Sequence, residues 1–145
     1  MSSEKVFLDT NVLVYAADRH SKPKREACRS LIREAATEGR AVVSTQVLQE
    51  FFVVATRKLG VAPLDAKELI GSFQNMEVVT VTTDRIGEAI DCSVVDRISF
   101  WDALIVVCAQ SASCDVLATE DLNDGQIIRG VRVENPLKGS RKKRR

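Results

Sequence analysis

Acidic residues follow two segments of the chain that read as short strands. Asp9 directly follows the run Lys5 to Leu8, and Asp121 ends the tripeptide that follows the run Asp115 to Ala118. Ligands of open α/β sheets bind beyond the carboxyl ends of the strands. If the two strands are parallel, both carboxylates therefore lie at the same edge of one sheet. Asp9 also has a local explanation, because aspartate is a favoured N-cap for the helix expected from Thr10.

Glu50 lies among apolar residues of a segment that reads as a helix, Gln46 to Leu59. It falls on the same helical face as Val47 and Val54, which follows from the spacing of helical neighbours. A carboxylate that faces a core is costly unless it is paired or binds a cation. The alternative is a rotated helix, with Glu50 at the border of a buried face made by Leu48, Phe52, Ala55 and Leu59.

Asp102 lies in the first turn of a strongly apolar segment, Phe100 to Ser113. Residues 103–109 are apolar on every side, which is typical of a central, buried helix. Ser99 precedes this helix as a good N-cap, and an acid in the first turn is favoured by the helix dipole. This capping role explains Asp102 locally, and it is compatible with metal binding.

The four acids together predict a site that none of them predicts alone. Carboxylates that converge at close range repel one another, so such a cluster requires a cation. Carboxylate oxygens without histidine or thiolate favour a hard ion, and we expect one or two Mg²⁺ or Mn²⁺ ions on Asp9, Glu50, Asp102 and Asp121. Ions of this kind activate water and stabilise the departing oxygen in phosphodiester hydrolysis. The pattern therefore predicts a metal-dependent hydrolase.

Strand-like and helix-like segments alternate along the chain. Further strands are expected at 41–44, 77–81 and 131–134, and helices at 10–18, 23–38, 46–59, 63–75, 83–97 and 100–113. Gly39 and Gly60 follow two of these helices, and Pro23 and Pro63 suit the first turns of two. The alternation predicts an α/β fold with a central parallel sheet of about four to five short strands flanked by helices.

Length and composition fit one globular domain. The chain has 145 residues, of which 45% are hydrophobic and 28% charged, and no internal repeat stands out. We expect a nuclease domain over residues 1–137 and a basic, disordered tail over residues 138–145. The longest apolar run, Ala103 to Ala109, is too short to cross a bilayer, and the N-terminus leaves no room for a signal peptide. These features predict a cytoplasmic protein with no membrane partner.

Charge is distributed unevenly along the chain. The whole chain sums to +1, but residues 1–137 carry 15 basic and 20 acidic residues, a net charge of −5. A basic surface for RNA must therefore be local. An RNA-holding arm is one interpretation of the tail, and a solvated terminus is the other. The basic residues of the tail are Lys138, Arg141, Lys142, Lys143, Arg144 and Arg145.

The histidine and cysteine content excludes other kinds of site. His20 is the single histidine, so a nuclease with two histidines as acid and base is excluded. No nucleophile turn lies near His20 in the sequence, which argues against a Ser-His-Asp triad. The four cysteines lack the two-residue gap of zinc and redox motifs, and we expect buried free thiols at Cys28, Cys92, Cys108 and Cys114.

With these residues in place, the sequence resembles the PIN-domain ribonucleases, and among them the VapC toxins of bacterial toxin–antitoxin systems. Four blocks, in the order and spacing of the family, carry the resemblance over about residues 5–136. The blocks are Val6-Phe-Leu-Asp9-Thr10-Asn11-Val-Leu-Val-Tyr15, Ser44-Thr-Gln-Val-Leu-Gln-Glu50-Phe51, Ser99-Phe-Trp-Asp102-Ala-Leu-Ile105 and Leu117-Ala-Thr119-Glu120-Asp121-Leu122.

The resemblance implies a single PIN-like domain that cuts single-stranded RNA with Mg²⁺ or Mn²⁺. It makes Asp9, Glu50, Asp102 and Asp121 the acidic ligands, with Thr10, Asn11 and Thr119 as polar residues that orient them. It also implies a homodimer and a cognate VapB-like antitoxin as partners.

The position of the fourth acid is the least settled by sequence. Glu120, Asp121 and Asp124 compete for it, and the Thr-x-Asp pattern that starts at Thr119 favours Asp121. Asp124 begins an Asp-Gly turn, for which a loop role is sufficient. Glu120 is expected to face solvent.

Several other functions compete with a toxin ribonuclease. A phosphatase with an Asp-x-Asp nucleophile would need an acid where Asn11 stands, and a phosphoreceiver domain would need paired acids after the first strand. A PIN nuclease of RNA processing, with no toxin role, has the same four acids. A non-catalytic PIN-like module that binds RNA or protein is disfavoured, because an acidic cluster without metal repels RNA.

Overall fold

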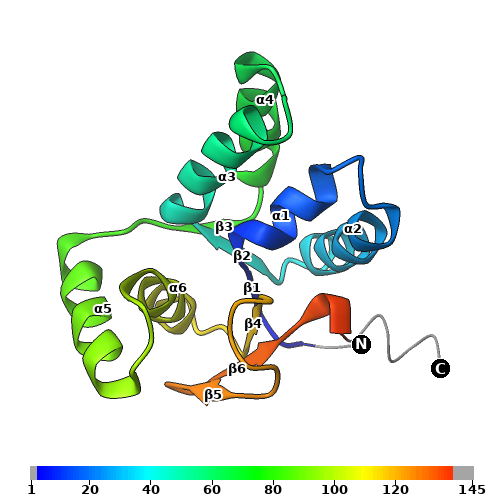
Figure 1. Ribbon diagram of the computed structural model, residues 1–145. Helices are drawn as coiled ribbons and strands as arrows, with labels where there is room; N and C mark the ends of the chain where they lie inside the picture. Colours follow the sequence, from blue (N-terminus) through cyan, green and yellow to red (C-terminus); the bar gives the residue numbers. More distant parts are fainter. Residues whose placement is uncertain (1–2, 139–145) are drawn as a thin grey trace.

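A computed structural model describes residues 3–138 as strands and helices in alternation (Figure 1). The strands are β1 (Val6–Leu8), β2 (Ala41–Ser44), β3 (Glu77–Val79), β4 (Val116–Ala118), β5 (Ile127–Ile128) and β6 (Val131–Glu134). The helices are α1 (Thr10–Ala17), α2 (Lys22–Thr37), α3 (Thr45–Arg57), α4 (Pro63–Phe73), α5 (Thr83–Asp96) and α6 (Phe100–Ser111). Of the predicted tail, residues 139–145 lie outside the described residues, so its role stays a prediction.

The strands form one sheet in the order β3-β2-β1-β4-β6-β5. Every neighbouring pair is parallel except β5 and β6, which are antiparallel. β1 lies in the interior of the sheet between β2 and β4, and all of its residues are buried. The α/β prediction is confirmed, and the observed sheet has one strand more than expected.

The extra strand, β5, belongs to a short hairpin that the sequence pattern did not predict. Ile127 pairs with Arg132 and Ile128 pairs with Val131. The two residues between the strands, Arg129 and Gly130, both have positive φ angles, of 51° and 82°. Two central residues with positive φ are typical of the tight turns that match the twist of a hairpin. An arginine is unusual in the first of these positions, so the local sequence does not indicate this turn.

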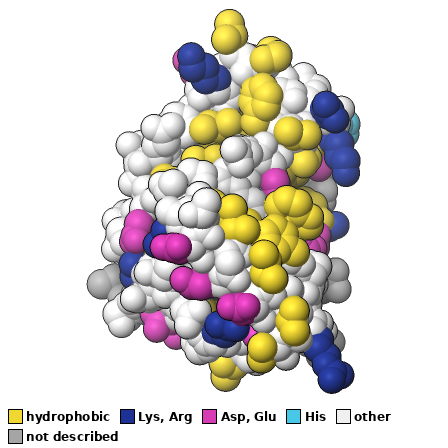
Figure 2. Space-filling view, turned by 90° about the vertical axis from the view of Figure 1, so that its left-hand side faces the viewer, with side chains coloured by type: hydrophobic (Ala, Val, Ile, Leu, Met, Phe, Trp, Pro, Cys, Tyr) yellow, Lys and Arg dark blue, Asp and Glu magenta, His cyan; other side chains and the backbone are white. Residues whose placement is uncertain are grey.

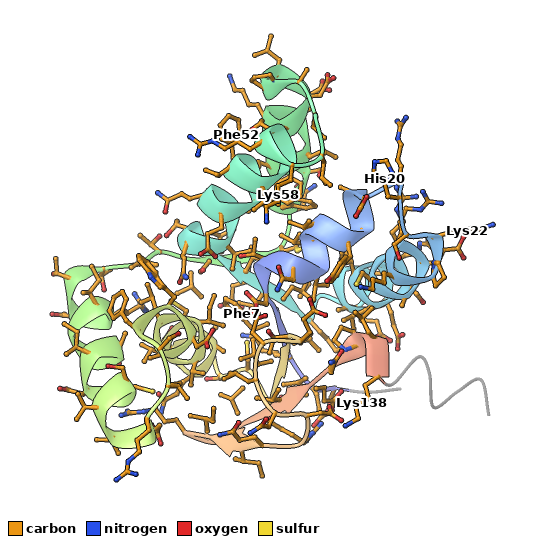
Figure 3. The ribbon with its side chains drawn as sticks, in the orientation of Figure 1. Phe7, His20, Lys22, Phe52, Lys58 and Lys138 are labelled. Carbon is orange, nitrogen blue, oxygen red and sulfur yellow. The ribbon has the colours of Figure 1, made fainter. Side chains whose placement is uncertain are left out.

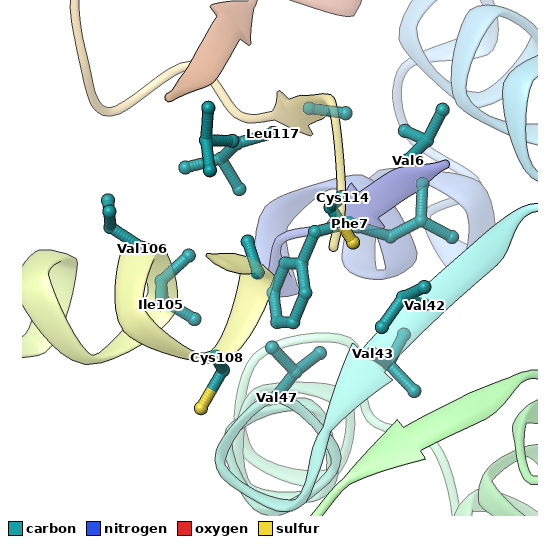
Figure 4. Close-up of a cluster of buried hydrophobic side chains, with 14 of the residues drawn as sticks. Val6, Phe7, Val42, Val43, Val47, Ile105, Val106, Cys108, Cys114 and Leu117 are labelled. Carbon is teal, nitrogen blue, oxygen red and sulfur yellow. The ribbon is translucent and has the colours of Figure 1, made fainter. Parts of the chain in front are cut away.

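The core lies between the sheet and the helices that cover it. Phe7 is completely buried, and its side chain points toward Val47 of α3, with Ile105 of α6 and Val42 of β2 on either side (Figure 4). The apolar segment of α6 is buried from Ala103 to Ala109, as expected for a central helix. These contacts fix the ends of α3 and α6 relative to β1.

The helices form groups around the sheet. In Figure 1, α1 and α2 lie together on the right, α5 and α6 on the left, and α3 and α4 project above.

All four cysteines are buried free thiols, which confirms the expectation for them. None of the helices in residues 3–138 has the length and apolar character needed to span a membrane.

One face of the molecule exposes apolar side chains. α5 presents Ile86, Ile90, Val94 and Val95 to solvent, with Val94 73% exposed. Figure 2 looks onto the side that carries α5 and shows hydrophobic side chains gathered above and to the right of a group of acidic ones. Exposed apolar surface of this kind is typical of sites of protein contact.

Candidate active site

Asp9 leaves the carboxyl end of β1 and caps the next helix. Its backbone N–H bonds to the Ala118 carbonyl of β4, at 3.1 Å, which ties the two strand ends together. Its Oδ1 accepts from the Thr10 N–H at 2.7 Å, and its Oδ2 accepts from the Thr119 hydroxyl at 2.6 Å. Asp9 is therefore the N-cap of α1, and these hydrogen bonds fix its carboxylate at the edge of the sheet.

The environment of Asp9 disfavours its ionised form. Its side chain is 6% exposed. Burial raises the pKa of Asp9, and the negative charges of Asp121 and Glu50 raise it too, so that it reaches about 6 despite the opposing hydrogen bonds from Thr119 and Thr10. A buried carboxyl among other carboxyls is a group that a cation would stabilise in its charged form.

Glu50 reaches the same region from α3. Ser44 caps this helix by accepting from the Val47 N–H at 3.3 Å, and the buried face that follows contains Val47, Phe51 and Ala55. Phe52 is 38% exposed, so the fully rotated helix is not the one observed. Glu50 lies half-buried at the border of the buried face, and its Oε1 accepts from the Thr10 hydroxyl at 2.7 Å.

Asp102 lies in the first turn of α6, where the capping arrangement expected from the sequence is present. Its N–H donates to the Ser99 hydroxyl at 3.1 Å. The carboxylate itself is half-buried and lines the same cleft as the other acids. Asp102 is also one of the negative charges that raise the pKa of Asp121. The cap and the site therefore use different atoms of the same residue.

Asp121 follows β4 on the loop that carries Thr119. Its N–H donates to the Thr119 hydroxyl at 3.1 Å, and both of its carboxylate oxygens accept from the Asn11 amide at 3.2 Å. Burial and the charge of Asp102 are the leading causes that raise its pKa. Thr119 thus contacts two of the acids through one hydroxyl.

The four acids line one cleft with a volume of about 540 Å³. Thr10 and Asn11 line it too, whereas Thr119 lies beneath it, 1% exposed. The remaining lining residues were not predicted from the sequence: Gln46, Gln49, Val53, Val54, Trp101 and Ile105. None of the lining residues is a lysine, arginine or histidine, so the cleft has a strongly negative character.

The other candidates for the fourth acid have different partners. Glu120 was expected to face solvent, but it is half-buried and accepts a 2.5 Å hydrogen bond from the Tyr15 hydroxyl. That prediction was wrong, because Tyr15 of α1 contacts Glu120 across 105 residues of sequence, and no local pattern indicates such a contact. Asp124 accepts from the Asn135 N–H at 2.9 Å, which is the loop role expected for it.

His20 takes no part in the cleft. It is exposed in the turn between α1 and α2, at the opposite end of α1 from the Asp9 cap (Figure 3). Lys22 lies in the same region (Figure 3), and Lys58 is the C-cap of α3. The chemistry of the cleft therefore depends on carboxylate, hydroxyl and amide groups.

The donor set suits a hard divalent ion, although the acids are not drawn into a closed cage. Among residues 3–138, no three histidine, cysteine or acidic side chains form a group that could hold an ion by themselves. Mg²⁺ commonly uses one or two carboxylates and keeps several waters. A cleft of this volume with oxygen donors around it fits an ion bound in that way.

The chain thus has a mostly parallel α/β sheet with a carboxylate-lined cleft beyond its strand ends, which is where ligands of such sheets bind. Residues 6–125 match the PIN domain family, and the chain is a member of that family. Its members are nucleases. No curated protein matches the chain over its sequence.

Solved structures of toxin–antitoxin proteins share the fold. The Mycobacterium tuberculosis VapC20 toxin, described as cleaving the sarcin–ricin loop, superposes with a TM-score of 0.65 at 18% identity, covering 81% of this chain and 92% of its own. VapBC from Salmonella typhimurium, solved bound to DNA, gives 0.65 at 22% identity, covering 92% and 98%. A toxin–antitoxin complex from Klebsiella pneumoniae gives 0.66 at 17% identity, covering 91% and 98%.

Proposed function

We propose that the protein is a Mg²⁺- or Mn²⁺-dependent endoribonuclease that cleaves single-stranded RNA. The observation that carries this proposal is the cleft shared by Asp9, Glu50, Asp102 and Asp121 from four separate segments of the chain. An unpaired group of carboxylates is unfavourable in a folded protein, so its presence is best explained by a bound cation.

The proposed roles follow from the contacts of each acid. Asp9 is the ligand held most firmly, by Thr119 and Thr10. Asn11 orients Asp121, and Thr10 orients Glu50. Glu50 and Asp102 complete the ligand set from the two helices. When bound, one or two ions supply the Lewis acidity that activates water for attack on phosphorus and stabilises the leaving oxygen.

We propose further that the protein acts as the toxin of a VapBC-type pair in the cytoplasm. The fold shared with VapC20 and with VapBC complexes supports this role. A VapB-like antitoxin could place an arginine in the cleft, where a guanidinium fork matches carboxylates and replaces the cation. The exposed apolar side chains of α5 support a homodimer, because they would be buried by a second copy.

Cleavage of a labelled single-stranded RNA tests the enzymatic proposal. We expect cutting with Mg²⁺ or Mn²⁺, loss of cutting with EDTA, and loss of cutting in Asp102→Asn with the circular dichroism spectrum unchanged. The substitution keeps the shape of the side chain and removes a charge that binds a hard cation. Cleavage by Asp102→Asn at the wild-type rate would contradict the metal mechanism.

Expression in a bacterial host tests the toxin role separately. We expect growth arrest that an adjacent antitoxin gene relieves. A protein that cuts RNA but leaves growth unaffected would be a PIN nuclease of RNA processing, and one that binds RNA without cutting it would be a non-catalytic module.

A further inference from the structure

The acids account for only part of the cleft wall. Trp101, Val53, Val54 and Ile105 also line it. Trp101 is 61% exposed and Val53 is 45% exposed. Large apolar groups are therefore open to solvent directly beside the acids proposed to hold the metal ion. A ligand with an apolar face would fit this wall.

Trp101 is held in a defined orientation. It lies next to Asp102 in the first turn of α6, and its ring meets that of Phe100 edge to face, with centroids 5.1 Å apart and an interplanar angle of 74°. Phe100 itself packs against the core. A ring fixed in this way loses little freedom when a ligand stacks on it.

Gln46 lines the cleft and carries a buried polar atom without a partner. Its side chain is 5% exposed, and its Oε1 is buried without a hydrogen-bond partner among residues 3–138. A buried amide carbonyl without a partner is unfavourable, so this atom is suited to accept from a ligand. Gln49, one turn further along α3, is exposed and lines the same cleft.

We propose that this wall is a nucleobase subsite, in which a base of the substrate RNA stacks on Trp101 and donates an N–H to Gln46. The inference rests on the proposed ribonuclease function. Aromatic rings bind single-stranded bases by stacking, and glutamine amides read base edges. Stacking does not depend on charge, so it supplies affinity that an acidic cleft cannot supply through phosphate contacts.

Fluorescence tests the subsite without any cleavage. Trp101 is the single tryptophan of the chain, so its emission reports on this position alone. We expect saturable quenching by adenosine, guanosine, cytidine and uridine, with strengths that differ among the bases, and none by ribose. These nucleosides contain no phosphodiester, so the result is independent of metal and of catalysis. Equal effects of ribose and of all four nucleosides would overturn the proposal.

Substitution of Gln46 separates recognition from packing. Gln46→Leu keeps the volume and removes the carbonyl that lacks a partner, so the free protein should be at least as stable as wild type. Quenching by nucleosides should persist, but the differences among bases should become smaller. An unchanged base preference in Gln46→Leu would remove Gln46 from the subsite.

Kinetics with RNA complete the test. Trp101→Ala should raise KM by about 5- to 150-fold, the range expected for one stacked base, with kcat nearly unchanged. Trp101→Phe should restore most of the affinity. The control is Leu64→Ala, which should leave KM unchanged because Leu64 of α4 is 76% exposed and lies outside the cleft.

If wild-type protein cuts no RNA, the proposed function fails, while nucleoside quenching still decides the subsite. Cleavage with equal KM in wild type and Trp101→Ala would overturn the subsite alone.

Discussion

The hydroxyl of Thr119 donates to Oδ2 of Asp9 at 2.6 Å, across 110 residues of sequence, and the Thr119 Oγ1 accepts from the Asp121 N–H at 3.1 Å. One buried threonine therefore positions the acids that follow both β1 and β4. It also lowers the pKa of Asp9, against burial and the neighbouring charges. Substitutions of these residues should therefore affect protein stability and metal binding to different extents.

Thr119→Val should weaken metal activation of RNA cleavage. Valine keeps the shape but leaves Asp9 Oδ2 and the Asp121 N–H without their partner, which should lower the free energy of unfolding by about 1–3 kcal/mol. Loss of groups that orient ligands typically costs about 10- to 100-fold in metal affinity. A Mg²⁺ titration of the cleavage rate measures the second effect. Thr119→Ser should restore it, and a destabilised variant with normal metal dependence would leave Thr119 with a packing role only.

Asp9→Asn should make the metal-free protein more stable at neutral pH while it abolishes cleavage. The pKa of Asp9 is near 6 in the folded state, above its ordinary value of 3.8. The folded state therefore binds the proton more tightly than the unfolded state, and the free energy of unfolding falls as pH rises between these two values. The shift corresponds to at most about 3 kcal/mol.

Denaturant unfolding in EDTA measures this effect. Asp9→Asn should exceed wild type in stability most at about pH 8, and it should lose most of that advantage near about pH 4, close to the ordinary pKa of 3.8 that Asp9 has in the unfolded state. Added Mg²⁺ should then stabilise wild type and leave the variant unchanged, because only the charged carboxylate attracts the ion. A variant less stable than wild type at every pH would show that the hydrogen bonds of Asp9 outweigh its burial.

Asn11→Ala should slow cleavage with little change in stability. The Asn11 amide contacts both carboxylate oxygens of Asp121 at 3.2 Å on the exposed side of the cleft. Its removal frees Asp121 to rotate, which should cost about 10- to 100-fold in activity. The matched control is Asn123→Ala, because Asn123 is exposed and lies on the loop that carries Asp121. Equal rates for the two variants would argue against a positioning role for Asn11.

Deletion of residues 138–145 should weaken RNA binding at low salt and leave the chemical step intact. The tail carries six basic residues beside a domain of net charge −5. Each phosphate contact on single-stranded RNA contributes about 0.7 to the slope of log affinity against log salt concentration. Binding measured over a range of salt concentrations should therefore give a flatter slope for the truncated protein. The same slope and affinity in both proteins would make the tail a bystander.

The sequence by itself determined the chemical character of this protein. Acids after two strands and acids inside two apolar helices predicted a hard-cation site, because a buried carboxylate needs compensation wherever it lies. Alternating strands and helices predicted the parallel sheet, since the periodicity of apolar residues is local information. In the structure Asp9 caps α1, Asp102 lies in the turn capped by Ser99, and both acids line the cleft.

Only the tertiary structure decided which side chains meet. The order of strands places β4 beside β1, and this brings Thr119 to Asp9 and Asp121 to Asn11. The position of Trp101 and the burial of Gln46 without a partner depend in the same way on how α3 and α6 pack over β1. Local pattern fixes which face of a helix is apolar, but contacts between residues far apart in sequence arise from packing, which no single segment encodes.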